Sequence, residues 1–310
     1  MNNYIKRRNF LKTILASPTL ATAGTLLTAQ PLQAKDKIKK AAGSKLRISL
    51  NAYSFNEPLR NGSMTLDDLL DFCAANDFDA VDLTAYYFPG YPAVPEDSYI
   101  FHLKQKAHRL GLDISGTGVK NDFTNPDKSK RKQDIKLIKK WIECAAKIGA
   151  PVIRIFSGTE IPAGHSWDEV ATWMVKDMKE CVEYGEKYGV IVAVQNHNDF
   201  IKTADHAQKL IKSVNSDWCG LVLDIGSYRN EDPYKEIEQT AKYAVNWQLK
   251  ETMFFNGIEQ KTDLQKVIAI IKQSGYRGYL PIETLGPGDP KIKVPLFLAQ
   301  VREALDKTSV

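Results

Sequence analysis

The chain of 310 residues carries 42 basic and 37 acidic residues, which gives a formal net charge of +5 at pH 7. Four of the basic residues and none of the acidic ones fall in the first 34 positions, so 38 basic and 37 acidic residues remain beyond them. A surface this close to neutral excludes nucleic acid and anionic lipid as expected partners. The remaining roughly 270 residues are enough for one large α/β domain with a buried core.

The first segment of the chain is typical of an export signal. Lys6, Arg7 and Arg8 precede an apolar stretch of small residues at 13–29, and no acidic residue occurs before Asp36. The basic run resembles the twin-arginine consensus, with Lys6 where Ser or Thr is usual. The apolar stretch falls short of the roughly 20 strongly apolar residues that a membrane span needs. This favours export over a permanent membrane anchor.

The domain boundaries follow from that signal. We predict a twin-arginine signal peptide at 1–34, a linker at 35–45 and a barrel domain at 46–306. Cleavage after Ala34 would follow a small residue, and an uncleaved form is the alternative. The expected location is the periplasm or the exterior, with membrane contact only during export.

Beyond the linker, short β-branched or apolar runs alternate with segments of helical spacing. The expected strands lie at about 46–52, 80–84, 112–116, 151–156, 190–195, 220–225, 245–250 and 278–283. Between them apolar residues recur three and four positions apart, as in Leu264, Val267, Ile268 and Ile271, which indicates amphipathic helices. Eight such units, without a Gly-x-Gly-x-x-Gly after the first strand, favour a closed barrel over an open sheet. We predict a single-domain α/β protein, a (β/α)₈ TIM barrel.

The four cysteines, Cys73, Cys144, Cys181 and Cys219, lie far apart in the sequence. They show neither Cys-x-x-Cys nor zinc-ribbon spacing. We expect buried free thiols, and one disulfide is the alternative in an oxidising compartment.

Polar residues occur at the ends of the last four predicted strands. Gln195, Asp224, Gln248 and Glu283 each follow a bulky apolar residue. In a TIM barrel the chemistry lies at the C-terminal ends of the strands, and alternating side chains bring these four to the barrel axis. Four oxygen donors from consecutive strands predict a cage for a hard or borderline divalent cation.

The same strand ends, which read Gln-Asn-His, Leu-Asp-Ile-Gly, Leu-Lys-Glu and Pro-Ile-Glu-Thr, resemble those of a known family. They are similar to the sugar phosphate isomerase/epimerase group of xylose-isomerase-like TIM barrels, over nearly all of 46–305. The resemblance implies a metal held by Glu, Asp, His and Glu, with the two glutamates moving protons on either face of the sugar carbon. Asp224 and Glu283 match this pattern, whereas Gln195 stands at the first Glu position and Gln248 at the His position.

The two glutamines change what the resemblance implies. Both keep an oxygen donor but remove a charge or an imidazole, which favours Mg²⁺ or Mn²⁺ over Zn²⁺. Gln195 cannot act as a base. One-base chemistry assisted by a metal is therefore expected in place of a symmetrical two-glutamate epimerisation.

Three residues are candidates for catalysis: Glu283, His197 and Lys250. His197 has the inward parity of Gln195. Histidine is the side chain most often used as a general base near neutral pH, so His197 could be the base, and a plain surface histidine is the alternative. Lys250 could stabilise an enediolate oxygen or bind a substrate hydroxyl. Its alternative role is a charge partner for Glu283 or Asp224.

Residues at the strand ends and in their loops are candidates for substrate binding: Tyr53, Phe55, Asn196, Arg154 and Arg229. Aromatic faces stack on sugar rings, with core packing as the alternative for Tyr53 and Phe55. A buried Arg154 could equally be structural.

The expected function is a divalent-metal-dependent sugar isomerase or epimerase. An exported enzyme rarely meets sugar phosphates, which favours a free sugar or sugar derivative as the small-molecule partner. The alternatives are a metal-assisted lyase or hydrolase of 3-keto glycosides, which needs one base only, and a sugar-binding barrel without catalysis. Neither a nucleic acid nor a lasting membrane partner is expected, and a homo-oligomer is left open.

Overall fold

A computed structural model of the protein describes residues 45–308. The signal peptide predicted at 1–34 and all but the last residue of the linker lie outside the described residues, so both stay predictions. Within residues 45–308, no helix is both long and apolar enough to cross a membrane.

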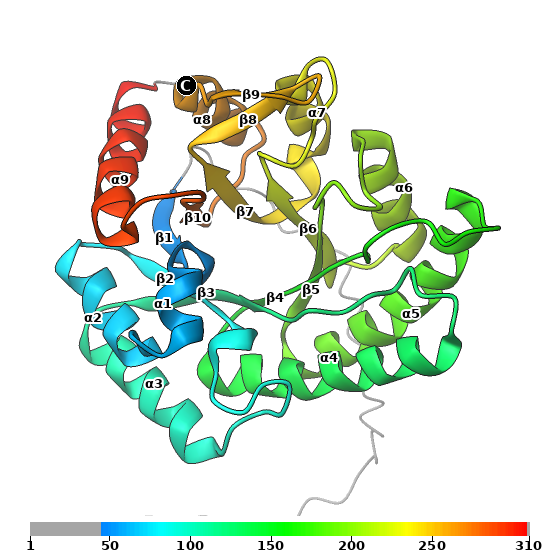
Figure 1. Cartoon of the computed structure of the whole chain (residues 1–310), viewed down its shortest axis with the longest axis horizontal. Helices are drawn as coiled ribbons and strands as arrows, with labels where there is room; N and C mark the ends of the chain where they lie inside the picture. Colours follow the sequence, from blue (N-terminus) through cyan, green and yellow to red (C-terminus); the bar gives the residue numbers. More distant parts are fainter. Residues whose placement is uncertain (1–44, 309–310) are drawn as a thin grey trace, which may run out of the picture. The chain divides into compact units, whose positions relative to one another are not determined.

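Eight parallel strands close into a barrel in the order β1-β10-β7-β6-β5-β4-β3-β2 (Figure 1). The barrel strands are β1 Arg47–Asn51, β2 Ala80–Thr84, β3 Asp113–Gly118, β4 Val152–Ile155, β5 Ile191–Gln195, β6 Cys219–Asp224, β7 Ala244–Lys250 and β10 Tyr279–Glu283. All eight lie within about two residues of the predicted ranges, the usual scatter of strand ends. The (β/α)₈ TIM barrel predicted from the alternation is confirmed.

Helices surround the strands on the outside of the barrel (Figure 1). Those in the described part of the chain are α1 Asn56–Asn61, α2 Leu66–Ala75, α3 Asp97–Arg109, α4 Lys128–Ile148, α5 Trp167–Tyr188, α6 Ala204–Val214, α7 Pro233–Thr240, α8 Leu264–Gln273 and α9 Pro290–Lys307. Local sequence sets their ends. Helix α5, for example, begins at a capping box of Ser166 and Glu169 and ends at Gly189, whose φ of 68° suits glycine.

The core has two parts because side chains alternate between the two faces of each strand. The larger part lies between strands and helices and includes the apolar residues that precede the polar strand ends: Val194, Leu223, Trp247 and Ile282. The smaller part, formed by Val152, Ala193 and Val222, fills the barrel below those ends. The parity predicted for these strands is confirmed, and it directs the polar residues at the strand ends toward the barrel axis.

All four cysteines are buried free thiols, as expected. Burial raises the pKa of the Cys144 and Cys219 thiols to about 12. Thiols this far from ionisation at neutral pH are unreactive.

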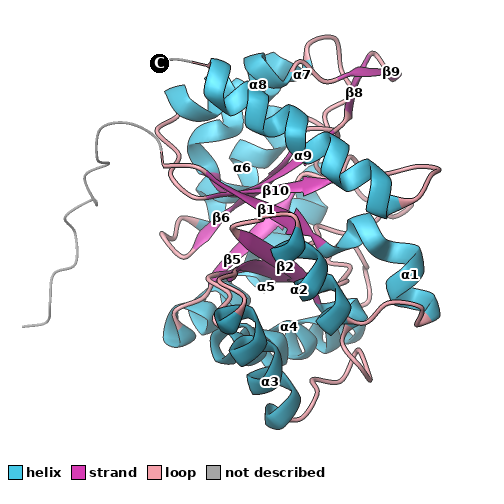
Figure 2. Cartoon of the chain, turned by 90° about the vertical axis from the view of Figure 1, so that its left-hand side faces the viewer, coloured by secondary structure: helices cyan, strands magenta, loops and turns pink. Residues whose placement is uncertain are grey.

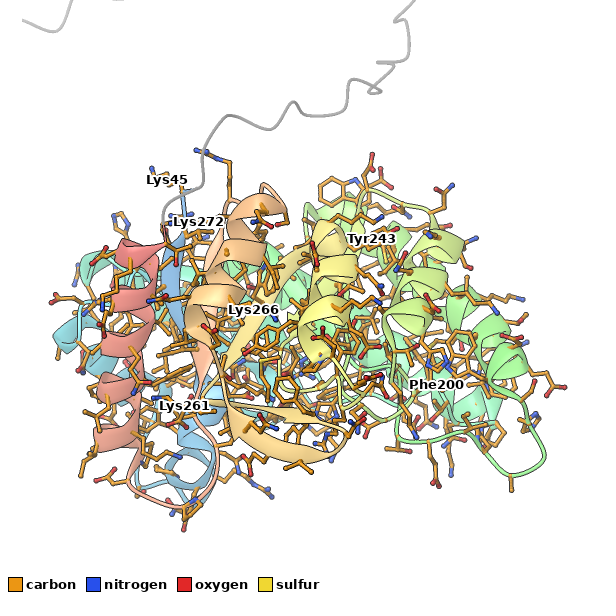
Figure 3. The ribbon with its side chains drawn as sticks, turned by 90° about the horizontal axis from the view of Figure 1, so that it is seen from above. Lys45, Phe200, Tyr243, Lys261, Lys266 and Lys272 are labelled. Carbon is orange, nitrogen blue, oxygen red and sulfur yellow. The ribbon has the colours of Figure 1, made fainter. Side chains whose placement is uncertain are left out.

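A short antiparallel hairpin, β8 Thr252–Phe255 and β9 Ile258–Lys261, follows β7 and was not predicted. Figure 3 shows Lys261 in the hairpin and Lys45 before β1 at opposite ends of the barrel. Figure 2 shows the hairpin and α1 at the same end. The hairpin therefore extends the C-terminal end of the barrel, where TIM barrels carry their sites.

Candidate active site

A pocket of about 740 Å³ opens among the loops at the C-terminal ends of the strands. Seven of the predicted site residues line it: Tyr53, Arg154, Gln195, His197, Gln248, Lys250 and Glu283. The four other predicted site residues, Phe55, Asn196, Asp224 and Arg229, are not among its lining residues. The size is typical of a site for a small molecule.

The floor of the pocket is a buried cluster of three charged side chains. Lys250 Nζ lies 2.8 Å from Asp224 Oδ2 and 3.1 Å from Glu283 Oε2. The Asp224 side chain is 0% exposed, Glu283 5% and Lys250 13%. Burial disfavours the ammonium, but the two carboxylates outweigh that effect and keep the pKa of Lys250 above its usual value. Two carboxylates therefore share one permanent positive charge.

The two strand-end glutamines connect to this cluster as hydrogen-bond donors. Gln195 Nε2 donates to Asp224 Oδ2 at 2.9 Å and to Gln248 Oε1 at 2.6 Å. Gln248 Nε2 donates to Glu283 Oε1 at 3.0 Å. The structure thus brings together all four side chains that were predicted to meet at the barrel axis.

The arrangement does not fit the four-oxygen metal cage that was expected of these residues. Each oxygen of Asp224 and Glu283 already accepts a hydrogen bond or an ammonium contact, since Asp224 Oδ1 accepts from Gly226 N at 2.9 Å. The amide nitrogens of both glutamines, and not only the side-chain oxygen of Gln248, point toward the other members of the group. In residues 45–308 no three His, Cys, Asp or Glu residues are grouped so as to hold a metal. The role of these four residues as metal ligands stays a prediction that the geometry does not support.

Asn196 supports the site from behind instead of binding substrate. It is fully buried, its Nδ2 donates to the backbone oxygen of Asp224 at 2.9 Å, and its Oδ1 accepts from the Asp224 backbone N–H at 2.9 Å. This pair of bonds fixes the end of β6 against the end of β5. This placement supports a positioning role, and the expected substrate contact stays a prediction that the geometry does not support.

Two other predicted substrate-binding residues lie away from the pocket. Phe55 is fully buried in the 3-10 helix Ala52–Phe55 and packs edge to face on Phe72, with ring centroids 4.8 Å apart. Arg229 is exposed, and its guanidinium lies 4.3 Å from the ring centroid of Phe254 in the hairpin. The substrate contacts expected of both stay predictions that this geometry does not support, because the short helix turns the Phe55 ring inward and Arg229 packs on a hairpin that was not foreseen.

His197 lies on the pocket wall, held by two contacts. Its Nδ1 lies 2.7 Å from Asp199 Oδ2, and its ring packs edge to face on Phe156 at 4.8 Å. Within the described chain Asp199 is the only hydrogen-bond partner of the ring, which leaves Nε2 free for a substrate. A histidine oriented by a carboxylate, with its second nitrogen free, has the form of a general base.

Arg154 is both anchored and part of the pocket wall. Its guanidinium donates to the backbone oxygen of Val119 and to Tyr86 Oη, each at 2.7 Å, and lies 4.0 Å from the ring centroid of Phe156. A Cβ at Gly118 would stand 2.7 Å from Arg154 Nε, so a larger residue there would displace the guanidinium. The structural role and the pocket role weighed for Arg154 are both compatible with this placement.

The sequence reasoning missed Asp82, a buried carboxylate on β2. Burial raises its pKa to about 6, the positive charge of Arg154 lowers it, and the charge of Glu283 raises it. It accepts one long hydrogen bond, 3.4 Å, from Asn246 Nδ2. An acid within a strand, at a position whose side chain faces the barrel axis, was a signal for this residue in the sequence.

Comparison with known proteins agrees with the fold. Residues 70–304 match the family described as xylose isomerase-like TIM barrel, so the chain belongs to that family. The match confirms the resemblance read from the strand ends at the level of the family. No curated protein is significantly similar in sequence.

Several solved structures share the architecture. D-psicose 3-epimerase from Clostridium cellulolyticum H10, solved with D-tagatose, matches with a TM-score of 0.69 and 16% identity over 84% of this chain and 99% of that chain. The 3-keto-D-glucoside 4-epimerase YcjR from E. coli matches at 0.66 and 13% over 84% and 99%. The IOLI protein with a zinc atom matches at 0.69 and 16% over 85% and 99%. Identities this low show a shared fold.

Proposed function

We propose that the protein is a sugar isomerase that moves a proton at the carbon next to a carbonyl group of a free sugar or sugar derivative. The observation that carries the proposal is the cluster of Asp224, Lys250 and Glu283 on the floor of a pocket whose wall holds His197. A charged floor beside an oriented base is what enolisation needs. The sugar epimerases among the structural relatives support the substrate class.

The residues divide the chemistry between them. His197 Nε2 removes the proton from the carbon and returns it to the neighbouring carbonyl carbon, while a proton passes from the hydroxyl oxygen of the first carbon to the carbonyl oxygen. Asp199 holds Nδ1 and stabilises the imidazolium that forms. The negative charge that develops on the carbonyl oxygen falls beside the ammonium of Lys250. Glu283 is the poorer base because both of its oxygens are engaged, by Lys250 and by Gln248.

The expected Mg²⁺ or Mn²⁺ forms no part of this scheme. One structural relative was solved with zinc, but the donor set in this chain does not fit a divalent cation. No step above depends on a metal.

One observation favours a second function, a lyase or hydrolase of 3-keto glycosides. Gln195 places an amide at the axis, with its N–H groups donating to Asp224 and Gln248, so no second acid stands there. A single base is enough to remove a proton beside a keto group and expel the glycosidic oxygen. A sugar-binding barrel without catalysis is the third candidate, and the oriented His197 argues against it.

The test offers free aldoses, ketoses and 3-keto glycosides to the protein in deuterated water. We expect aldose–ketose interconversion, with solvent deuterium in the product at the former carbonyl carbon, which receives the proton. Release of the aglycone from a 3-keto glycoside would support the lyase, and binding without turnover would support the binding barrel. Clean inversion at one carbon of a ketose would contradict the one-base scheme.

A pair of histidine variants tests the base. His197→Ala should lower turnover by about 10²–10⁴-fold, the usual loss when a general base is removed. His108→Ala is the matched control, because His108 is exposed on α3 outside the barrel. Equal turnover in both variants would show that His197 is a surface histidine.

We also propose export through the twin-arginine route, on the basis of the basic run at 6–8 and the apolar stretch behind it. Replacing Arg7 and Arg8 by Lys should keep the protein in the cytoplasm. Arrival of that variant in the periplasm would show that the signal is of another kind.

A further inference from the structure

The floor of the pocket is built around a lysine ammonium. Lys250 Nζ contacts one oxygen of Asp224 and one of Glu283, while the remaining two carboxylate oxygens accept from Gly226 N and Gln248 Nε2. An ammonium has three N–H groups, and in the described chain only the two carboxylates contact this one. Because Lys250 lines the pocket, its third N–H is free to meet a substrate oxygen.

The backbone around Lys250 makes room for it at this place. Lys250 pairs with Glu283 in the register of β7 and β10, so the two side chains leave neighbouring strands at one level. A Cβ at Gly226 would stand 2.8 Å from Lys250 Cδ, so the lysine stem passes where only glycine leaves space. The same Gly226 donates its N–H to Asp224. Gly226 thus leaves space for the Lys250 stem and also donates a hydrogen bond to Asp224, one of the two carboxylates that hold the ammonium.

The neutral glutamines limit the excess negative charge around the Lys250 ammonium. Two carboxylates around one ammonium leave one negative charge in excess, and a third acid at position 195 would leave two. Uncompensated charge at a buried site costs several kcal/mol. Gln195 and Gln248 instead donate N–H groups to the two carboxylates already present, which stabilises them without further charge. The glutamines therefore keep the excess negative charge around the ammonium at one, where an acid at position 195 would raise it to two.

We propose that the Lys250 ammonium is the resident cation of this site, taking the place of a divalent metal, and that its third N–H donates to the carbonyl oxygen of the substrate. No covalent bond to Lys250 is formed or broken. The role toward substrate rests on the proposed function, whereas the metal-free character of the site does not. Asp224 and Glu283 become positioning residues that hold the ammonium.

The first test uses the unmodified protein. Protein purified without chelator should contain far less than one equivalent of any divalent metal, and neither EDTA nor millimolar Mn²⁺ should shift its melting temperature. One tightly held equivalent of metal whose removal lowers the melting temperature would overturn the proposal. This arm needs no variant, so it decides the question even if every variant misfolds.

The second test removes the ammonium. Lys250→Met keeps the length of the stem but leaves Asp224 and Glu283 without their cation, so the variant should gain a site for Mn²⁺. Millimolar Mn²⁺ should then raise the melting temperature by several degrees and bind stoichiometrically in titrations followed by electron paramagnetic resonance. Lys293→Met is the control, because Lys293 lies 3.4 Å from a single carboxylate, that of Glu251, and should gain no such site. A folded Lys250→Met variant that neither binds Mn²⁺ nor gains melting temperature from it would contradict the proposal.

These readouts separate this proposal from the proposed function. Metal content, melting temperature and Mn²⁺ binding need no substrate, so a failure to isomerise sugars would overturn the function and leave the resident cation in place. Conversely, a sugar isomerase whose turnover is abolished by EDTA and restored by Mn²⁺ would keep the function and overturn the resident cation.

Discussion

Two buried charge clusters in this protein have similar geometry and different surroundings. On the helical layer, Arg131 Nε lies 2.6 Å from Asp177 Oδ2, with side chains 8% and 13% exposed. At the barrel axis, Lys250 lies between Asp224 and Glu283 with comparable burial. Burial and close pairing are common to both, so neither feature marks a functional site by itself.

The two clusters differ in the charge balance around the cation and in whether the cation has an unused N–H group. Arg131 also donates to the backbone oxygens of Asn125 and Pro126 and lies 5.1 Å from the ring centroid of Trp173, so its planar group is enclosed by partners. Its charge is balanced one to one, and it joins α4 to α5. Lys250 has an excess of negative charge around it and a free N–H at a pocket. An excess of negative charge and an N–H group that is open to the pocket together distinguish the cluster proposed to be reactive from the structural one.

The largest expected effect tests the structural cluster. Arg131→Met leaves Asp177 buried without its partner and should lower the free energy of unfolding by about 3–5 kcal/mol, measured by denaturant titration. Turnover per folded molecule should stay within about twofold, because Arg131 lies outside the pocket lining. A tenfold loss of turnover in the folded variant would remove the distinction drawn between the two clusters.

The next largest effect is expected at Asp82, a carboxylate near the barrel axis that accepts one long hydrogen bond. Burial raises the pKa of Asp82 from 3.8 to about 6, so between those values the folded state binds more protons than the unfolded state. The stability contributed by this group therefore falls as pH rises through the window and stays low above it. Asp82→Asn should match the wild type near pH 4 and exceed it by roughly 3 kcal/mol at pH 7–8.

Denaturant titrations of both proteins at pH 4, 5, 6 and 7.5 check this dependence. Asp113→Asn is the control, because Asp113 is exposed and pairs with Arg47 at the surface. A constant difference between Asp82→Asn and the wild type across the four pH values would show that the buried acid does not titrate in this range.

The sequence was enough to predict the barrel and the convergence of its polar strand ends. Both depend on local rules, since alternation along a strand sets which side chains face the axis, and the C-terminal ends of β5, β6, β7 and β10 obey it. The parity of Lys250 followed from the same rule. What the alternation left open was whether the Lys250 ammonium would meet a substrate oxygen or pair with Glu283 or Asp224.

The features that sequence could not supply depend on contacts between distant segments. The path of the Lys250 stem requires the absence of a side chain at Gly226, which a reading of β7 alone does not show. Arg229 turns to Phe254 in a hairpin too short and too polar in β9 to be recognised beforehand. The metal cage was expected because only the side-chain oxygens of the two glutamines were considered. In the structure their amide nitrogens donate to Asp224 and Glu283.

The smallest expected effect is on KM. It should distinguish a residue that lines the pocket from one that only lies near the same end of the barrel. Tyr53 lines the pocket with 38% of its surface exposed, and its ring offers a face for a sugar. Loss of one aromatic contact of about 0.5–1.5 kcal/mol should raise KM of Tyr53→Ala by a factor of about 2–10 with little change in kcat. Arg229→Ala should lose only the contact with Phe254, worth about 0.5–1 kcal/mol of stability, and keep both kinetic constants. If the two variants raised KM equally, the substrate would extend past the pocket to the hairpin, and the boundary of the site drawn by the lining residues would be too narrow.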